Sequence, residues 1–319
     1  MELKRGSTKL IKNPSLLDDK VISEKLNQQI MITEKEENTD TLISHGAIGA
    51  PMVNTMSKFQ KVIIAKNKWW GNMLWLDNVV NVTERDEFVY HEMIVHVPMM
   101  IHASPKRVLI IGGGDGGAAR EVLKHPGVEK FVMVDIDEVV VNECKKHLPG
   151  LNNGAFDDPR LELIIGDGID YVKKAADNSF DVIIVDSTDP IPDSCGEVLF
   201  TTDFYKDCLR VLDKDGVVTT QSIMPMRYDK EIYRKSLSNL QEAFTKEKTW
   251  IYLIPTDTYN GQTSLGLCFK GDSHPETLSK DRIKAFEKAN QFKYYNFKVH
   301  QAAFCLPNYL KDYMGVSDA

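Results

Sequence analysis

The chain has 319 residues, 42% of them hydrophobic and 27% charged, which is ordinary for a folded globular protein and excludes a fibrous or low-complexity one. The net charge of −7 disfavours nonspecific nucleic-acid binding and favours a cationic substrate. The N-terminus lacks an apolar segment of signal-peptide length, and no run approaches the ~18 apolar residues of a membrane span. The five cysteines include no C-x-x-C pair, so we expect reduced thiols in a soluble, cytoplasmic protein without a membrane partner.

The N-terminal quarter of the chain predicts a small β domain. Residues 1–24 are polar and are interpreted as an N-terminal extension. Residues 25–85 contain short β-rich runs separated by turn residues such as Asn67, Gly71 and Asp77. The predicted strands are residues 29–33, 61–65, 72–76 and 79–83. This spacing is typical of a small antiparallel sheet.

Residues 86–319 predict a Rossmann-like catalytic domain. A helix over residues 84–98 comes first, with acids in its first turn, where the helix dipole favours them. The predicted strands that follow are residues 107–112, 130–135, 161–166, 180–186, 216–221, 248–254 and 263–269. The predicted helices are residues 117–125, 137–148, 168–177, 202–213, 229–245 and 280–290. The last two strands have no helix between them, which predicts one antiparallel strand in an otherwise parallel α/β sheet of the class I methyltransferase type.

The segment of residues 108–121 is an apolar strand, a glycine-rich turn and the start of a helix. Gly112 and Gly114 would let a nucleotide-like ligand approach the backbone, and the helix offers free N–H groups at its start. Asp115 lies inside this turn, where a carboxylate would repel phosphate. The turn therefore favours a sulfonium nucleoside, S-adenosylmethionine or its decarboxylated form, over NAD or ATP.

Further acids stand at the ends of the next predicted strands. Asp135 ends the second strand, where a carboxylate can bind ribose hydroxyls, and Asp167 precedes Gly168, where it can accept from an adenine amino group. Asp186 ends the fourth strand, with Asp189 just behind it. Ligands of open parallel sheets bind beyond these strand ends, so we expect one shared site. For any one of these acids alone, a role as helix N-cap or turn residue is the competing interpretation.

The pair Asp186 and Asp189 predicts chemistry on an amine. An amine enters as an ammonium with a pKa near ~10.4 and must lose a proton before it attacks. One carboxylate can take that proton, and the second can hold a distal ammonium. Tyr90 either orients the amine through its hydroxyl or caps the core. No metal site is expected, because His91 and His96 are five residues apart and do not share a helix face.

Taken together, these segments resemble the spermidine synthases, the polyamine aminopropyltransferases, over residues 58–311. The segments that carry the resemblance are residues 83–93, 108–121, 166–168, 186–191 and, as in the bacterial branch, 294–307. The resemblance implies transfer of the aminopropyl group of decarboxylated S-adenosylmethionine to a diamine such as putrescine, giving spermidine and 5′-methylthioadenosine. It also implies a homodimer or homotetramer without prosthetic group or metal.

The resemblance also implies roles for single residues. Asp186 would be the base, and Tyr90 would position the attacking amine. The residues implied on the donor side are Gln60, Gly112, Gly114, Asp115, Asp135, Asp167 and Gly168. The residues implied in binding the amine substrate are His91, Asp189 and Tyr259.

Three departures from the family pattern lie on the acceptor side. The loop after Pro190 is longer and has Pro192 in place of a glycine, and the loop after Pro255 is longer as well. The strand that ends near Gln221 lacks the acid that many members place two residues later. The acceptor is therefore left open among putrescine, cadaverine, agmatine, longer polyamines and other amines.

Other functions remain open from the sequence alone. One is an amine N-methyltransferase that uses S-adenosylmethionine itself, as the plant putrescine N-methyltransferases do. Another is transfer of an aminopropyl or aminocarboxypropyl group to an atypical acceptor, and a third is an inactive binding protein, against which the intact acids argue. A donor carboxylate would lie near Asp115 and Asp186, and the turn carries no cation before Arg120. This favours the decarboxylated donor.

Overall fold

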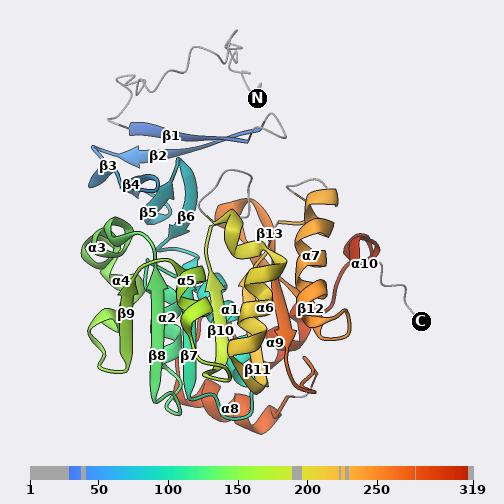
Figure 1. Ribbon diagram of the computed structural model, residues 1–319. Helices are drawn as coiled ribbons and strands as arrows, with labels where there is room; N and C mark the ends of the chain where they lie inside the picture. Colours follow the sequence, from blue (N-terminus) through green and yellow to red (C-terminus); the bar gives the residue numbers. More distant parts are fainter. Residues whose placement is uncertain are drawn as a thin grey trace.

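The computed structural model describes residues 29–36, 41–188, 196–222, 224–226, 230–276 and 278–314. Strands stacked at one end of the molecule lie against a larger part in which helices cover a central sheet (Figure 1). No helix within these residues combines the length and the apolar character needed to cross a membrane. The cysteines in this part of the chain are free thiols.

The N-terminal strands form two antiparallel sheets. They are β1 (Gln29–Glu36) with β2 (Thr41–Ile48), and a second sheet of β3 (Val53–Met56), β4 (Lys61–Asn67), β5 (Gly71–Leu76) and β6 (Val79–Thr83) in that order. Side chains alternate along β4, so that Val62 and Ile64 pack toward α3 (Glu138–His147) while Ile63 and Ala65 share a cluster with residues of β1 and β2. The predicted antiparallel region is confirmed, although β2 and β3 were not predicted; the domain boundary at residue 85 stays a prediction.

A seven-stranded sheet forms the larger part, in the order β12-β13-β11-β10-β7-β8-β9. Its strands are β7 (Arg107–Gly112), β8 (Lys130–Asp135), β9 (Leu161–Ile165), β10 (Phe180–Asp186), β11 (Leu212–Gln221), β12 (Thr249–Thr256) and β13 (Gly261–Phe269). Only β13 runs antiparallel to its neighbours, β11 and β12. The predicted fold class is therefore confirmed, including the single antiparallel strand.

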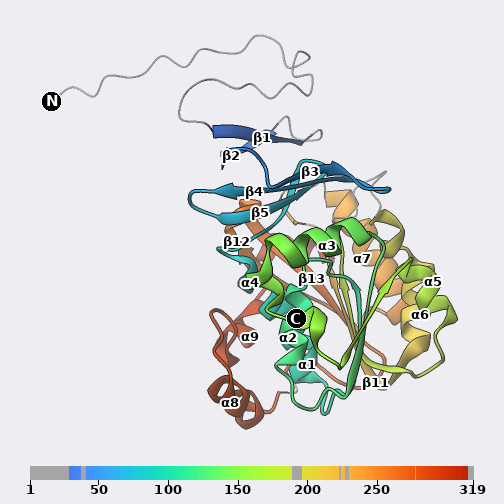
Figure 2. The ribbon, with the colours of Figure 1, turned by 90° about the vertical axis from the view of Figure 1, so that its left-hand side faces the viewer.

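Helices cover both faces of this sheet because its strands are apolar on both sides. Val108 and Ile110 of β7 pack with α1 and α2, whereas Leu109 and Ile111 pack with α5, α6 and α7 on the opposite face (Figure 2). The helices are α1 (Glu87–Ile101), α2 (Gly117–Leu123), α4 (Pro149–Asn152), α5 (Gly168–Lys174), α6 (Thr202–Val211), α7 (Lys230–Phe244), α8 (Lys280–Ala289), α9 (Phe297–Ala303) and α10 (Asn308–Met314).

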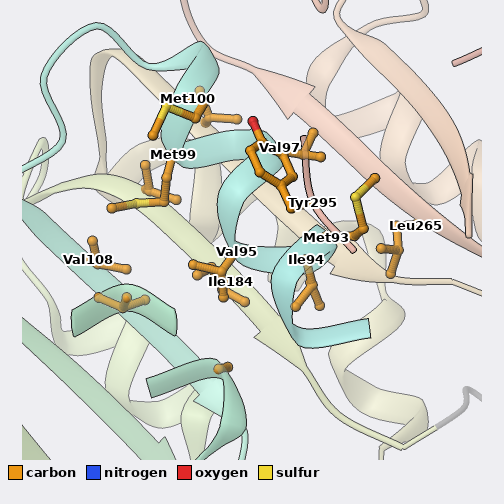
Figure 3. Close-up of a cluster of buried hydrophobic side chains, with 14 of the residues drawn as sticks. Met93, Ile94, Val95, Val97, Met99, Met100, Val108, Ile184, Leu265 and Tyr295 are labelled. Carbon is orange, nitrogen blue, oxygen red and sulfur yellow. The ribbon is translucent and has the colours of Figure 1, made fainter. Parts of the chain in front are cut away.

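Helix α1 is anchored in the hydrophobic core. Its side chains Met93 and Ile94 are fully buried and lie near Leu265 of β13 and Ile184 of β10 (Figure 3). Truncating such a side chain to alanine typically costs ~2–5 kcal/mol. The helix starts three residues later than predicted. It also continues past Pro98, because the Arg282 guanidinium donates hydrogen bonds to carbonyl oxygens of its last turn and C-cap.

The sheet order changes direction between β7 and β10. The chain runs from β7 outward through β8 and β9, and then returns to place β10 and β11 on the other side of β7. Gly112 and Asp186 are register partners at the ends of these two central strands. A crevice at such a switch point is the usual place for ligands in open α/β sheets.

Candidate active site

A cavity of about 390 Å³ lies beyond the carboxyl ends of the central strands. Its walls come from the strand ends, from the first turns of α1, from the N-terminal sheet and from the short helix η4 (Asp257–Tyr259). Every predicted site residue that the structure describes lines it. These residues are Gln60, Tyr90, His91, Gly112, Gly114, Asp115, Asp135, Asp167, Gly168, Asp186 and Tyr259. Asp189 and Pro192 lie outside the described residues.

Asp186 has one oxygen bound and one without a partner. The Tyr90 hydroxyl donates to Asp186 Oδ1 at 2.8 Å, and Asp186 Oδ2 is buried with no hydrogen-bond partner among the described residues. Burial, and then the negative charge of Asp115, raise the pKa of Asp186 to about 6. A carboxylate that titrates close to neutral pH and keeps an unpaired oxygen at a cavity wall is suited to accept a proton.

The glycine turn holds Asp186 in place as well as shaping the cavity. Gly112 has φ +81°, and a Cβ on it would lie 2.0 Å from the backbone oxygen of Asp186. The Gly113 N–H donates to that same oxygen at 2.8 Å. Only glycine allows this approach of β7 and β10. The turn therefore has a structural role that the sequence did not reveal.

Asp115 pairs with a histidine from α1. Asp115 Oδ1 accepts from the Gly117 N–H at 2.7 Å and lies 3.4 Å from His91 Nε2. On the other side of the ring, His91 Nδ1 lies 2.7 Å from Glu87 Oε2. Burial opposes a charge on the imidazole, but Asp115 and Glu87 outweigh it and hold the pKa of His91 well above its ordinary value. The site therefore contains a cation that the sequence interpretation did not count.

Asp135 and Asp167 lie on the side of the cavity predicted for the nucleoside. Asp135 Oδ1 accepts from the Asp137 N–H at 2.8 Å, and burial, despite backbone hydrogen bonds, raises the pKa of Asp135 to about 6. Asp167 is the N-cap of α5, because its Oδ1 accepts from the Ile169 N–H at 2.8 Å. The competing interpretation as a helix cap is thus observed for Asp167, which also lines the cavity.

Asp137 links the N-terminal sheet to the part of the cavity wall that contains Asp135. It caps α3, and its Oδ2 accepts from the Ser57 hydroxyl at 2.7 Å and from Gln60 Nε2 at 3.0 Å. Gln60 is only 7% exposed. Asp137 therefore holds Gln60 at the cavity wall. In the sequence, the only sign of this contact is that Asp137 follows Asp135 by two residues.

A second cluster of hydrogen bonds fastens η4 at the opposite end of the cavity. Asp86 Oδ1 accepts from the hydroxyls of Thr83 at 2.7 Å and Thr258 at 2.5 Å, and its Oδ2 accepts from the Thr258 N–H at 2.9 Å. The Tyr259 hydroxyl donates to the backbone oxygen of Asn81. The longer loop after β12 is thereby tied to the start of α1, which places Tyr259 in the wall.

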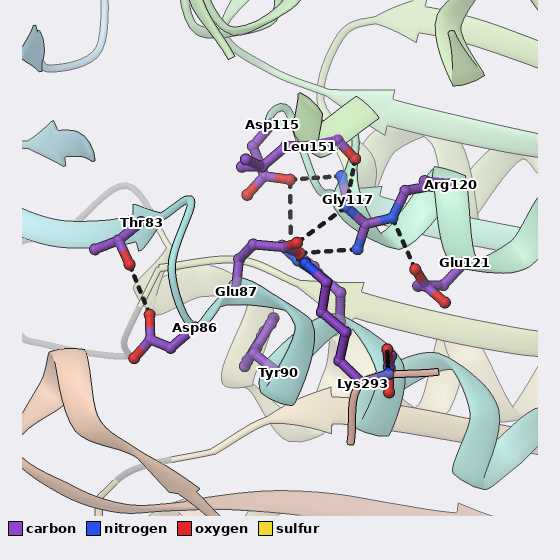
Figure 4. Close-up of polar contacts among 12 residues, drawn as sticks. Thr83, Asp86, Glu87, Tyr90, Asp115, Gly117, Arg120, Glu121, Leu151 and Lys293 are labelled. Atoms are coloured by element: carbon purple, nitrogen blue, oxygen red, sulfur yellow. Dashed lines mark hydrogen bonds and ion pairs between the residues drawn. The ribbon is translucent and has the colours of Figure 1, made fainter. Parts of the chain in front are cut away.

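Glu87 lies in the first turn of α1, as predicted, and both Asp86 and Glu87 also have specific partners. Asp86 makes no N-cap hydrogen bond and instead holds η4, while Glu87 contacts His91 and Arg120. Figure 4 shows Asp86 beside Thr83, and Glu87 beside Arg120. Gln221, which was not predicted as a site residue, also lies at the site, with its Oε1 3.1 Å from the Tyr90 hydroxyl. Asp86, Glu87 and Gln221 lie within or beside the predicted motifs, and this position was the signal from which their roles could have been found.

The side chains of Arg120 and His96 contact acids other than Asp115 and Asp186. Arg120 donates to Glu87 Oε2 at 2.8 Å and to Glu121 Oε1 at 2.7 Å. His96 contacts Glu121 and His125, and within the described part of the chain no lysine or arginine lines the cavity. The cavity thus has acids on several sides and His91 as the basic side chain among its described lining residues.

Comparisons with known proteins agree with this arrangement. A family model described as spermine/spermidine synthase domain matches residues 87–276, and one described as spermidine synthase tetramerisation domain matches residues 52–84. The polyamine aminopropyltransferase of Thermoanaerobacter sp. (strain X514) is 45% identical over 82% of this chain and 90% of its own. That of Ruegeria sp. (strain TM1040) is 42% identical over 88% of this chain and 99% of its own.

Solved structures show the same likeness in three dimensions. A spermidine synthase in complex with the transition-state analogue AdoDATO superposes with a TM-score of 0.85 at 36% identity, covering 94% of this chain and 99% of that one. The spermidine synthase from Thermotoga maritima superposes with a TM-score of 0.83 at 35% identity, covering 95% and 99%.

Proposed function

Because the chain belongs to the spermine/spermidine synthase family, we propose that it transfers the aminopropyl group of decarboxylated S-adenosylmethionine to putrescine, giving spermidine and 5′-methylthioadenosine. The observation that carries this proposal is the buried Oδ2 of Asp186, which has no hydrogen-bond partner among the described residues and lies beside Tyr90 in a cavity lined by acids. Such a site suits a cationic donor and a cationic acceptor.

The chemistry requires a base next to the attacking nitrogen. The acceptor ammonium gives a proton to Asp186, and the freed nitrogen lone pair attacks the carbon attached to sulfur. The carbon–sulfur bond breaks, and its electron pair stays on sulfur, so that the sulfonium becomes a neutral thioether. The Tyr90 hydroxyl keeps its proton, because burial and then the charge of Asp186 raise the pKa of Tyr90 well above its ordinary value. It can therefore act as a fixed donor to Asp186, while its oxygen can accept a hydrogen bond from the amine.

The remaining roles follow the positions of the residues in the cavity. Gln60, Asp135 and Asp167 would hold the nucleoside, and Asp115 would bind the ammonium of the donor's aminopropyl chain. Tyr259, together with Asp189 beyond the described residues, would line the acceptor end.

The surroundings of Asp115 favour the decarboxylated donor over S-adenosylmethionine. The guanidinium of Arg120 is engaged by two glutamates, and the charge of His91 is flanked by Asp115 and Glu87. A donor carboxylate would meet further carboxylates there, and like charges about 4 Å apart repel by roughly 4 kcal/mol at an effective dielectric constant near 20. N-methyl transfer from S-adenosylmethionine is therefore the weaker alternative.

A product assay tests the proposed function. The protein is incubated with either donor and with putrescine, cadaverine, agmatine or spermidine, and the products are identified by mass spectrometry. We expect methylthioadenosine and an aminopropylated amine from the decarboxylated donor, with putrescine the preferred acceptor. Methylated amines and S-adenosylhomocysteine formed from S-adenosylmethionine would overturn the proposal.

The assembly and location of the enzyme are part of the same proposal. The tetramerisation-domain match over residues 52–84 supports a homo-oligomer, for which we expect a homotetramer measurable by light scattering. The division into residues 25–85 and 86–319 and the cytoplasmic location stay predictions.

A further inference from the structure

A row of buried charged side chains leads from the cavity into the protein. Asp115, His91, Glu87 and Arg120 follow one another with alternating sign, joined by contacts of 3.4, 2.7 and 2.8 Å (Figure 4). The side chains of His91 and Glu87 are 2% and 5% exposed, so the pairs are screened little by water. Asp115, His91 and Glu87 all line the cavity, and Arg120 closes the row on the side of the protein interior.

The positions of His91 and Glu87 are tightly constrained. A Cβ on Gly117 would lie 2.3 Å from His91 Cε1, so the imidazole packs directly against the backbone at the start of α2. Arg120 Nη1 donates to Glu87 Oε1 at 3.1 Å and to the Leu151 carbonyl at 2.7 Å, and its Nη2 donates to Glu87 Oε2 at 2.8 Å. This two-pronged contact fixes the Glu87 carboxylate, which in turn binds His91 Nδ1.

We propose that Glu87, held by Arg120, is a positioning residue that keeps His91 charged and fixed beside Asp115, so that Asp186 can be ionised next to a second carboxylate. The inference rests on the proposed function, in which Asp186 accepts the amine proton. Without the imidazolium, Asp186 would face the charge of Asp115 with less compensation, and it would retain its proton to higher pH.

The groups around Asp186 and His91 support this balance of charges. Asp186 faces Tyr90 and His91 from α1 and Asp115 from the glycine turn. Its charge also contributes to the raised pKa of Asp135 of β8. The charge of Asp115 raises the pKa of Asp186, whereas the charge of His91 lowers it. The contacts of Glu87 among the described residues are with His91 and Arg120, and we infer that its effect on Asp186 passes through His91.

Four variants test the inference through the pH dependence of kcat/KM for the donor between pH 5 and 9. They are Glu87→Gln, His91→Gln, the double variant, and Glu92→Gln as the matched control. Glu92 is also buried on the same helix, but it accepts hydrogen bonds from the backbone N–H groups of residues 293–295. Any titration of the acceptor is common to all variants, so a difference between midpoints belongs to the enzyme.

We expect Glu87→Gln and His91→Gln each to move the acid-side midpoint up by about one pH unit, the usual effect of losing one close opposite charge. The double variant should show no further rise, because Glu87 acts through His91. Glu92→Gln should keep the wild-type midpoint even if its Tm falls. A further variant, Glu87→Asp, keeps the charge and should therefore show most of the wild-type profile. If Glu87→Gln does not fold, the comparison of Glu87→Asp with the single variant His91→Gln carries the test.

A lower Tm with an unchanged midpoint in Glu87→Gln would overturn the inference, since it would show a structural role only. Additive midpoint shifts in the double variant would also overturn it, because Glu87 would then act independently of His91. A wild-type protein that is inactive with the decarboxylated donor would instead overturn the proposed function itself.

Discussion

The hydrogen bond from Tyr90 to Asp186 is the contact whose removal should change catalysis most selectively. Tyr90→Phe removes one hydroxyl and leaves the ring, which is 7% exposed, in the core. The lost bond, 2.8 Å long, is assisted by the carboxylate charge and is worth about 1.5–3 kcal/mol. The variant leaves Asp186 without its described partner on Oδ1, in addition to the unpartnered Oδ2.

The consequence is a displaced pH profile. The pKa of Asp186 is already raised to about 6, and Tyr90 counteracts that rise by favouring the ionised form. Because ~1.4 kcal/mol corresponds to one pH unit, the acid-side midpoint of kcat/KM should move up by about one to two units. Activity at pH 7 should therefore fall about twofold to tenfold, and the deficit should shrink toward pH 9 as Asp186 ionises.

The assay is a set of pH profiles of kcat/KM for wild type and Tyr90→Phe, with donor affinity measured separately by calorimetry. Donor affinity should change little. In an Asp186→Asn background, Tyr90→Phe should cause no further loss in the residual rate. A uniform loss with the same midpoint at every pH would refute the reasoning, since Tyr90 would then act on the amine alone.

Three other changes have distinct expected outcomes. Asp186→Asn should lower kcat by ~100-fold or more through loss of the base while donor affinity, measured by calorimetry, stays within about tenfold; near-wild-type turnover would contradict the base assignment. Asp167→Ala should weaken product inhibition by methylthioadenosine about tenfold and lower the free energy of unfolding by ~1 kcal/mol, because the α5 N-cap is lost; unchanged inhibition would count against the nucleoside role. Thr258→Val removes a hydrogen bond to Asp86 and should raise KM for the acceptor about tenfold but not KM for the donor; equal effects on both constants in steady-state kinetics would argue against a role confined to the acceptor end.

Much of the fold could be predicted because its signals are local. Strands buried on both faces are continuous apolar runs, as in β7, β10 and β4. The start of α1 was misplaced by three residues because acids at 84–87 resemble a helix N-terminus, whereas Asp86 is bound to Thr258, far along the chain. The continuation past Pro98 likewise depends on a distant residue, Arg282.

The convergence of the acids was also predictable from the chain alone. Asp115, Asp135, Asp167 and Asp186 follow successive parallel strands, whose carboxyl ends meet at one edge of the sheet. Their residue types already exclude a simple phosphate cradle and favour a cationic ligand. The sequence by itself therefore determined the class of site and the family.

Only the tertiary structure decided the charge state and the partners of these groups. The contacts of His91 with Asp115, of Glu87 with Arg120 and of Asp86 with Thr258 join segments whose separation along the chain carries no periodic signal. Whether a carboxylate stays ionised depends on its burial and on the charges around it, and both are set by how distant elements pack. For this protein, the sequence determines which acids reach the cavity, and packing determines which of them can accept a proton.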